Sequence, residues 1–306
     1  LSSGSISLKK ADANIISTDG NVTASGNVKA DTSNIIMSAG GALTFGDASD
    51  LTNPALKVND GSAKISAKND ILANGNIDVS KADLIIHSKE GGVTLGEETD
   101  LTNPALKVAN GSAKILADDG ALIIKGDVDM TAITADALMQ GKSVAMENLK
   151  LYDNTKNSVI NATEGDVSIK SITLTNNKET VDGKTTNKTI TINATDGSIN
   201  VDKDIIVSSS NLNMLADNGI KGNNLTVSDS VSGDSSNPTF GTILNAENGD
   251  VALNKVSVNN AMAAIQSSAG NVNIKDSLTV TTDSETESRA YVIAENGKVS
   301  IGEGVT

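Results

Sequence analysis

Hydrophobic and polar residues alternate along most of the chain in short runs, and the runs return roughly every twenty residues. Examples are IISTDGNVTA (15–24), ITINATDGSINV (190–201) and ILNAENGDVALN (243–254). Each combines a Val, Ile or Leu run, a polar turn that ends in Gly, and apolar residues at every second position. Alternation with a period of two predicts β-strands rather than helices. A repeat of this length, built from strands, indicates a chain that coils and stacks on itself.

We expect one coil to contain a strand, a tight bend, a second strand and a looser return. In the stretch VSIKSITL (167–174) the polar pair Lys170-Ser171 breaks the alternation between two strand-like runs. Gly closes the turns because positive φ is cheap without a Cβ, and a neighbouring Asp or Asn tolerates the left-handed region. Turns of this kind are predicted at Asp60-Gly61, Asn110-Gly111 and Asn248-Gly249.

An antiparallel meander is the rival architecture, since Asn-Gly and Asp-Gly are also hairpin signals. The glycine spacing favours coiling. Gly20 and Gly40 are 20 residues apart, and Gly249 and Gly270 are 21 apart, which suits a full turn of the chain better than one hairpin.

A near-duplicate segment points to repeated modules. DLTNPALKV occurs at 50–58 and again at 100–108, each followed closely by GSAKI, which predicts modules around 41–65 and 92–115. Three stretches lengthen the repeat and predict surface insertions at 176–189, 228–242 and 281–291. Such insertions either present binding surface on a rigid scaffold or are neutral additions that a repeat tolerates.

The composition disfavours a single globular core. The 306 residues include two Phe, two Tyr and no Trp, so the interior must be narrow and filled by aliphatic side chains. A formal net charge of −14 argues against nucleic acid and anionic membrane surfaces as partners. No apolar stretch is long enough for membrane insertion. Cysteine is absent, which excludes disulfides and thiolate metal sites.

Candidate chemistry is sparse. His87 is the single histidine, so a histidine-based triad or a multi-histidine metal site is excluded. Clustered carboxylates at 118–119 and at 127 and 129 would suit a polysaccharide lyase or hydrolase, but they also read as turn residues, and we expect no enzyme. Calcium is the one cofactor that the acidic turns suggest. The candidate ligands lie in the two duplicated modules: Asp47, Asp50, Glu97 and Asp100.

The opening stretch SGSISLKKADANIISTDGNVTASGNVKADTSNIIMSAGGALTF, with its G-N-V and G-S-I steps, resembles the repeats of filamentous-haemagglutinin-like bacterial exoproteins. The resemblance is one of repeat style and covers essentially the whole chain. Autotransporter passengers and some phage tail spikes have related textures. The resemblance implies a right-handed parallel β-helix that is exported unfolded through an outer-membrane pore and forms the shaft of a large adhesin.

Together these observations predict an all-β fold, a right-handed parallel β-helix (solenoid) of about twelve to fourteen coils with surface-loop insertions. Residues 1–306 would form a single segment of a longer chain, because the sequence starts at Leu1 and ends on VSIGEGVT. We expect the structural shaft of an extracellular bacterial adhesin, at the cell surface, with a receptor or glycan on a host or neighbouring cell as its partner. Alternatives are a self-assembling filament or surface-layer subunit that joins end to end, and a β-helical polysaccharide lyase or hydrolase.

Overall fold

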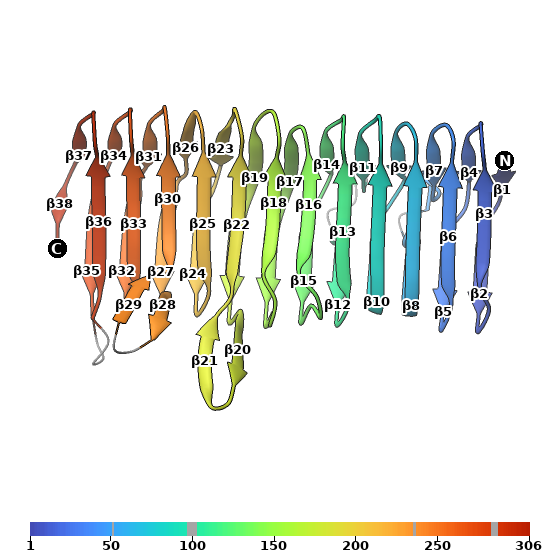
Figure 1. Ribbon diagram of the computed structural model, residues 1–306, viewed down its shortest axis with the longest axis horizontal. Coiled ribbons are helices and arrows are strands. Elements are labelled where there is room, and N and C mark those ends of the chain that lie inside the picture. The colour runs from blue at the N-terminus through green and yellow to red at the C-terminus, as the bar shows by residue number, and fades with distance from the viewer. Residues whose placement is uncertain (51, 97–102, 235–236, 283–286) are drawn as a thin grey trace. The chain divides into compact units, whose positions relative to one another are not determined.

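The structure is a computed structural model of residues 1–306 and describes all of them except 51, 97–102, 235–236 and 283–286. Every secondary-structure element in the described residues is a β-strand (Figure 1). The chain divides into two compact units, unit 1 at Leu1–Glu147 and unit 2 at Asn148–Thr306. The all-β prediction is therefore confirmed.

In the described part of unit 1, strands pair in parallel within three columns, and the chain visits the columns in the order A, B, C before it returns to A. Column A holds β1 (Ser2–Ser3), β4 (Val22–Ala24), β7 (Leu43–Phe45), β9 (Ile71–Ala73), β11 (Val93–Leu95), β14 (Leu122–Ile124) and the start of β17 (Val144–Tyr152). Column B holds β2 (Ile6–Lys9), β5 (Val28–Asp31), the first halves of β8 (Leu56–Ala67) and β10 (Ile77–Ser88), β12 (Leu106–Ala109) and β15 (Val128–Thr131). Column C holds β3 (Ala13–Ser17), β6 (Asn34–Ala39), the second halves of β8 and β10, β13 (Ser112–Ala117) and β16 (Ala137–Gly141).

This pairing differs from the sequence-based expectations in two ways. The antiparallel meander is wrong for these columns, since every pairing in them is parallel. The looser return expected in each coil contains a strand of its own. The reason is that the Val, Ile or Leu run before each Gly turn, such as ANIIS at 13–17, alternates between the two faces like the other strands.

The spacing of the pairs shows where the repeat is lengthened. In column A, Val22 pairs with Leu43, 21 residues later, and Ile71 with Val93, 22 residues later. Between these, Leu43 pairs with Ile71 and Val93 with Leu122, at 28 and 29 residues. The two duplicated modules fall in these long steps, so their extra residues leave the columns without changing the register.

The core of unit 1 is made of aliphatic side chains in register. One column C row is fully buried and consists of Met37, Ile65, Ile86, Ile115 and Met139. Successive strand residues point to opposite faces, so the residues between them point outward. Burial of each such side chain contributes about 1.5–3 kcal/mol. These rows replace the aromatic core that the composition lacks.

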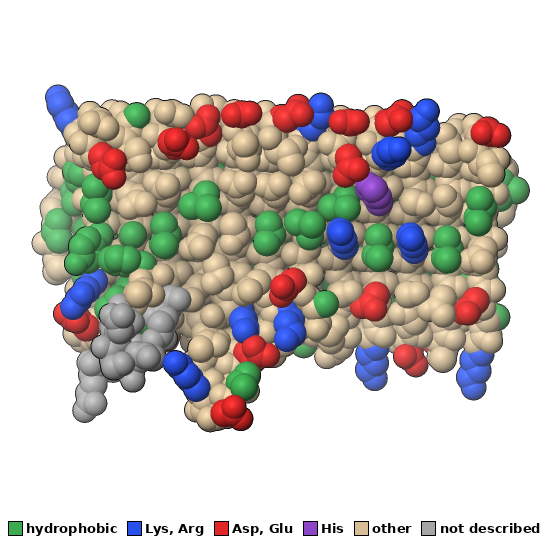
Figure 2. All heavy atoms as spheres, viewed as in Figure 1, with side chains coloured by type: hydrophobic (Ala, Val, Ile, Leu, Met, Phe, Trp, Pro, Cys, Tyr) green, Lys and Arg blue, Asp and Glu red, His purple; other side chains and the backbone are tan. Residues whose placement is uncertain are grey.

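The outward row of column C alternates in character along unit 1. Ile36, Lys64, Ile85, Lys114 and Leu138 occupy successive paired positions. Figure 2 shows hydrophobic and basic side chains in turn across this face. Lysine stems cover neighbouring apolar surface while their ammonium groups stay in water, which limits the exposed apolar area.

The bend between columns B and C carries a left-handed residue in each repeat of unit 1. These residues have φ between 49° and 57° and are Lys10, Thr32, Asp60, Lys81, Asn110 and Ala132. The prediction that glycine supplies the positive φ at Asp60-Gly61 and Asn110-Gly111 is wrong, because the residue before the glycine does so. Gly61 is required for a different reason: a Cβ there would overlap the carbonyl oxygen of Ser33 on the preceding strand.

Turn side chains tie each repeat to the next. The Asn21 Oδ1 accepts a hydrogen bond of 2.9 Å from the backbone N–H of Ala42, and the Asp70 Oδ1 accepts one of 2.8 Å from Gly92. In unit 2 the Asp250 Oδ1 accepts 2.7 Å from the N–H of Asn271. Each bond satisfies a backbone donor that has no strand partner, and it selects one register.

In the described part of unit 2, strands again pair in parallel within three columns, D, E and F. Column D holds the first part of β19 (Val167–Thr175), β23 (Ser198–Val201), β26 (Gly219–Lys221), β31 (Val251–Leu253), β34 (Val272–Ile274) and β37 (Val299–Ile301). Column E holds the second part of β19, β24 (Ile205–Ser208), β27 (Asn224–Ser228), β32 (Lys255–Asn259), β35 (Ser277–Thr281) and β38 (Gly304–Val305). Column F holds β18 (Ser158–Ala162), β22 (Thr189–Ala194), β25 (Asn211–Ala216), β30 (Thr242–Ala246), β33 (Met262–Ser267) and β36 (Arg289–Ala294).

Two of the stretches expected as insertions in unit 2 form antiparallel hairpins. β20 (Lys178–Val181) pairs with β21 (Lys184–Asn187) inside 176–189, and β28 (Val231–Asp234) pairs with β29 (Asn237–Phe240) inside 228–242. Figure 1 shows the hairpin β20–β21 extending away from the columns of unit 2. In the third stretch, 281–291, residues 289–291 belong to β36.

A buried polar row lies at the bend between columns E and F. Asn177 is fully buried, and its Nδ2 donates to the carbonyl of Leu151 at 3.1 Å and to the Ser210 Oγ at 2.9 Å. Its Oδ1 accepts 3.1 Å from the backbone N–H of Asn154. Buried amide groups need partners of this kind, because an unmade bond costs about 1–3 kcal/mol.

Candidate functional site

The metal candidates Asp47 and Asp50 lie in the first duplicated module, and both carboxylates are held by protein donors. The Asp50 Oδ1 accepts from the Thr52 hydroxyl at 2.6 Å, and its Oδ2 accepts from the amides of Asn27 and Asn53, each at 3.0 Å. The hydrogen bond from Thr52, followed by those from Asn53 and Asn27, holds the pKa of Asp50 far below its usual range. The carboxylate therefore ties the module to the preceding strand at Asn27.

Asp47 caps its own turn. Its Oδ1 accepts from the Ser49 hydroxyl at 2.6 Å and from the Ser49 N–H at 2.9 Å, and the hydroxyl bond lowers the pKa of Asp47. Glu97 and Asp100, the other candidates, lie outside the described residues. Within 1–50, 52–96, 103–234, 237–282 and 287–306, no group of three or more His, Asp or Glu side chains gathers in a way that could hold a metal ion. Calcium binding stays a prediction.

The acid/base candidates at 118, 119, 127 and 129 do not converge on one pocket. Asp118 faces the single histidine, with 2.8 Å between its Oδ2 and the His87 Nε2, on the exposed surface of column C. Asp129 accepts a bond of 3.3 Å from the hydroxyl of Thr131 on its own strand. Register explains the separation, since His87 and Leu116 are the paired residues and Asp118 follows at the turn.

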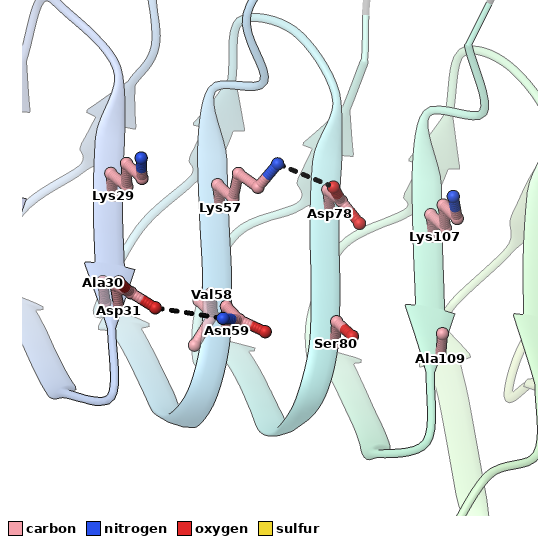
Figure 3. A pocket seen from close by; sticks show the side chains of 10 residues that line it. All are labelled: Lys29, Ala30, Asp31, Lys57, Val58, Asn59, Asp78, Ser80, Lys107 and Ala109. Atoms are coloured by element: carbon pink, nitrogen blue, oxygen red, sulfur yellow. Dashed lines mark hydrogen bonds and ion pairs between the residues drawn. The ribbon is translucent and has the colours of Figure 1, made fainter.

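The most developed concave feature of unit 1 lies on the outer side of column B. This lysine groove has a volume of about 500 Å³. It is lined by Lys29, Ala30, Asp31, Lys57, Val58, Asn59, Asp78, Ser80, Lys107 and Ala109 (Figure 3). The lining residues come from β5, β8, β10 and β12, which are neighbours in the parallel pairing.

Charged side chains alternate across the lysine groove. Lys29, Lys57, Asp78 and Lys107 hold paired positions on four successive strands. The Lys57 Nζ lies 3.6 Å from the Asp78 Oδ2, and the Asn59 Nδ2 donates to the Asp31 Oδ1 at 3.0 Å (Figure 3). Both Lys57 and Asp78 remain partly exposed, so solvent screens the pair and its contribution to stability is small.

A smaller cavity of about 150 Å³ adjoins the lysine groove and is shaped by the two duplicated modules. Its lining includes Asn53-Pro54 from the first module and Asn103-Pro104 from the second, with Asn76 and Asp78 between them. The two LTNPALKV segments thus face the same cavity from alternate strands. The sequence shows the duplication but not this meeting, since only the register reveals that one strand separates the copies.

Aromatic residues also meet where the sequence gave no signal. Phe240 at the end of hairpin β28–β29 packs edge-on against Tyr291 of β36, with ring centroids 4.9 Å apart and an interplanar angle of 78°. The two residues are 51 positions apart along the chain. This geometry is favourable for aromatic pairs and attaches the hairpin to column F of unit 2.

No helix suited to crossing a membrane occurs in the described residues. No protein-family model, curated protein or solved structure matches the chain. Functional inference therefore rests on the parallel columns, the lysine groove and the projecting hairpins.

Proposed function

We propose that the chain forms a right-handed parallel β-helix and serves as the structural shaft of an extracellular bacterial adhesin. In this reading each coil comprises one strand from each of three columns, and the coil closes when the chain returns to the first column. The handedness is supported by a general rule, since connections between parallel strands of one sheet are right-handed in about 98% of cases. The repeat style of the sequence supports the assignment to a bacterial surface protein.

The observation that carries the proposal is the unbroken register of buried rows. In unit 2, Val251 is fully buried and pairs with Ile220 on one side and Val272 on the other. Each inner strand is hydrogen-bonded to two neighbours, so bending would break backbone bonds and aliphatic contacts together. A shaft needs this resistance to bending because it must hold an attachment site at a distance.

The projecting hairpins support a role in presentation. β20–β21 leaves column F between β19 and β22 without disturbing their neighbours, because Ile160 and Ile192 still pair directly across the gap. Lys188 and Lys156 both pair with Glu179 at the base of this hairpin, at 2.6 Å and 3.5 Å. The resulting charge contacts lower the pKa of Glu179, with the Lys188 hydrogen bond as the largest cause.

Limited proteolysis of matched variants of the full chain tests the architecture. Val251→Asp buries a charge in the row of column D and should speed cleavage by tenfold or more, whereas Ala252→Asp, on the outward side of the same strand, should change it less than twofold. Equal resistance of the two variants contradicts the stacked core.

Small-angle scattering tests the shaft itself. An elongated particle that lengthens by about 4.8 Å for each coil added is expected. A compact particle contradicts the shaft function even if the strands are parallel.

A further inference from the structure

We propose that the lysine groove of unit 1 binds a linear polysaccharide that carries carboxylates, a chain of uronic acids, laid across β5, β8, β10 and β12. This inference rests on the proposed attachment function, for which it names a surface and a ligand class. The argument uses the charges, the hydrogen-bonding groups and the repetition of the groove in turn.

Two cationic groups in the groove are available to a ligand. Lys29 and Lys107 are exposed, and neither has an ion-pair partner among the described residues (Figure 3). They stand three strand spacings apart, about 14 Å, with the Lys57–Asp78 pair between them. The groove therefore offers separated ammonium groups in a row, on a protein whose formal net charge is −14. A linear ligand with several negative charges matches this row better than a compact anion.

The acidic groups of the groove select among polyanions. Asp78 and Asp31 lie among the lysines, with their carboxylates on the same surface. A carboxylate is an acceptor only, so it repels a bare polyphosphate but accepts hydrogen bonds from hydroxyl groups. A uronic acid chain carries both hydroxyl donors and carboxylates, and it satisfies both kinds of group. Nothing aromatic is present among the described lining residues, so stacking of a neutral sugar ring has no platform here.

The duplication adds a repeating element to the surface. Lys57 and Lys107 follow identical TNPAL stretches and lie on alternate strands, about 10 Å apart. A polymer with a regular repeat meets equivalent groups at both positions. Binding of successive ligand units to equivalent sites raises the overall affinity without any single strong contact.

Fluorescence anisotropy of the full chain with labelled polygalacturonate oligomers tests the proposal. We expect saturable binding that weakens roughly tenfold when salt rises from about 50 to about 150 mM, since about two ammonium groups are involved. The double variant Lys29→Gln, Lys107→Gln should weaken binding roughly tenfold, because each exposed ion pair contributes up to about 1 kcal/mol.

The chain provides a matched control for this variant. Lys64 and Lys114 stand seven residues after Lys57 and Lys107 in the two modules, on column C outside the groove, and both are exposed. Lys64→Gln, Lys114→Gln removes the same charge and should change the affinity less than twofold. Equal losses in the two double variants overturn the site, since they indicate attraction to overall charge.

Competitors distinguish the ligand class. Poly-glutamate and polyphosphate of equal charge should compete at least tenfold less well than polygalacturonate, because they lack sugar hydroxyls. Equal competition by either, or by a sulfated polysaccharide, overturns the assignment to uronic acids. Failure of binding in a chain that still scatters as an elongated particle overturns this inference alone, whereas a compact particle overturns the shaft as well.

Discussion

The carbonyl oxygen of Asn218 lies against Gly249 with no room for a Cβ between them. The two residues belong to successive turns of unit 2, and the N–H of Asn248 donates to the carbonyl of Asp217 at 2.7 Å beside them. Glycine at this turn serves the close approach of two backbones. Similar overlap at Gly61 with Ser33 shows that the requirement recurs in unit 1.

Gly249→Ala is therefore expected to destabilise the chain by about 1–3 kcal/mol, as overpacking in a rigid interior does. The midpoint of urea unfolding measures the effect. Gly4→Ala is the control, because nothing lies within 4 Å of a Cβ at Gly4 and its φ is not left-handed. Equal midpoints for the two variants contradict the close approach.

Thr32 is a β-branched residue with a φ of 49°, and Asn110 occupies the equivalent bend with a φ of 53°. A left-handed conformation costs roughly 1–2 kcal/mol for most L-residues and less for Asn. Thr32→Asn should raise the free energy of unfolding by about 0.5–1 kcal/mol, and Asn110→Thr should lower it by a similar amount. Thermal unfolding of both variants and of the double exchange measures these changes. Shifts of the same sign in the two single variants contradict the assigned bends.

Asp50 gives the chain an acid-sensitive contact. Its pKa in the folded chain is lowered by the Thr52, Asn53 and Asn27 hydrogen bonds, so the carboxylate contributes stability above its unfolded pKa of 3.8 and loses it as pH falls through the folded value. Asp50→Asn should lower Tm by a constant amount above about pH 4, and the gap should narrow at lower pH.

The control for this pH series is Asp60→Asn, since no hydrogen bond to the Asp60 carboxylate occurs among the described residues and Asn also tolerates its φ of 57°. Its Tm should track that of the parent chain at neutral pH. A gap for Asp50→Asn that widens on acidification reverses the expected sign.

Local alternation and the glycine repeat predict the strands and their parallel pairing, because both depend on residues close together in sequence. The bend residues were not predicted, since Lys81 and Ala132 carry no left-handed preference and are placed by the strands on either side. The lysine groove also escaped prediction. Lys57 meets Asp78 only if the 21-residue offset between them is known, and a slip of one position would turn both side chains inward.

The carboxylates show the opposite limit. Asp50 reads as a metal ligand in sequence, but its partner Asn27 is 23 residues away and no local pattern identifies it. The pairing of Phe240 with Tyr291 likewise needs the hairpin to fold back onto column F. Contacts between distant segments decide both sites, and a single sequence does not supply them.

The equal spacing of the two duplicated modules has a genetic consequence. Leu56 and Leu106 lie 50 residues apart, on β8 and β12, with one strand of column B between them. Unequal recombination between the copies would excise two whole windings and rejoin β5 to a hybrid strand in the same register, with the bends and buried rows intact. Molecular length would then be a heritable variable that changes in steps of about 10 Å, without selection having to rebuild the interior.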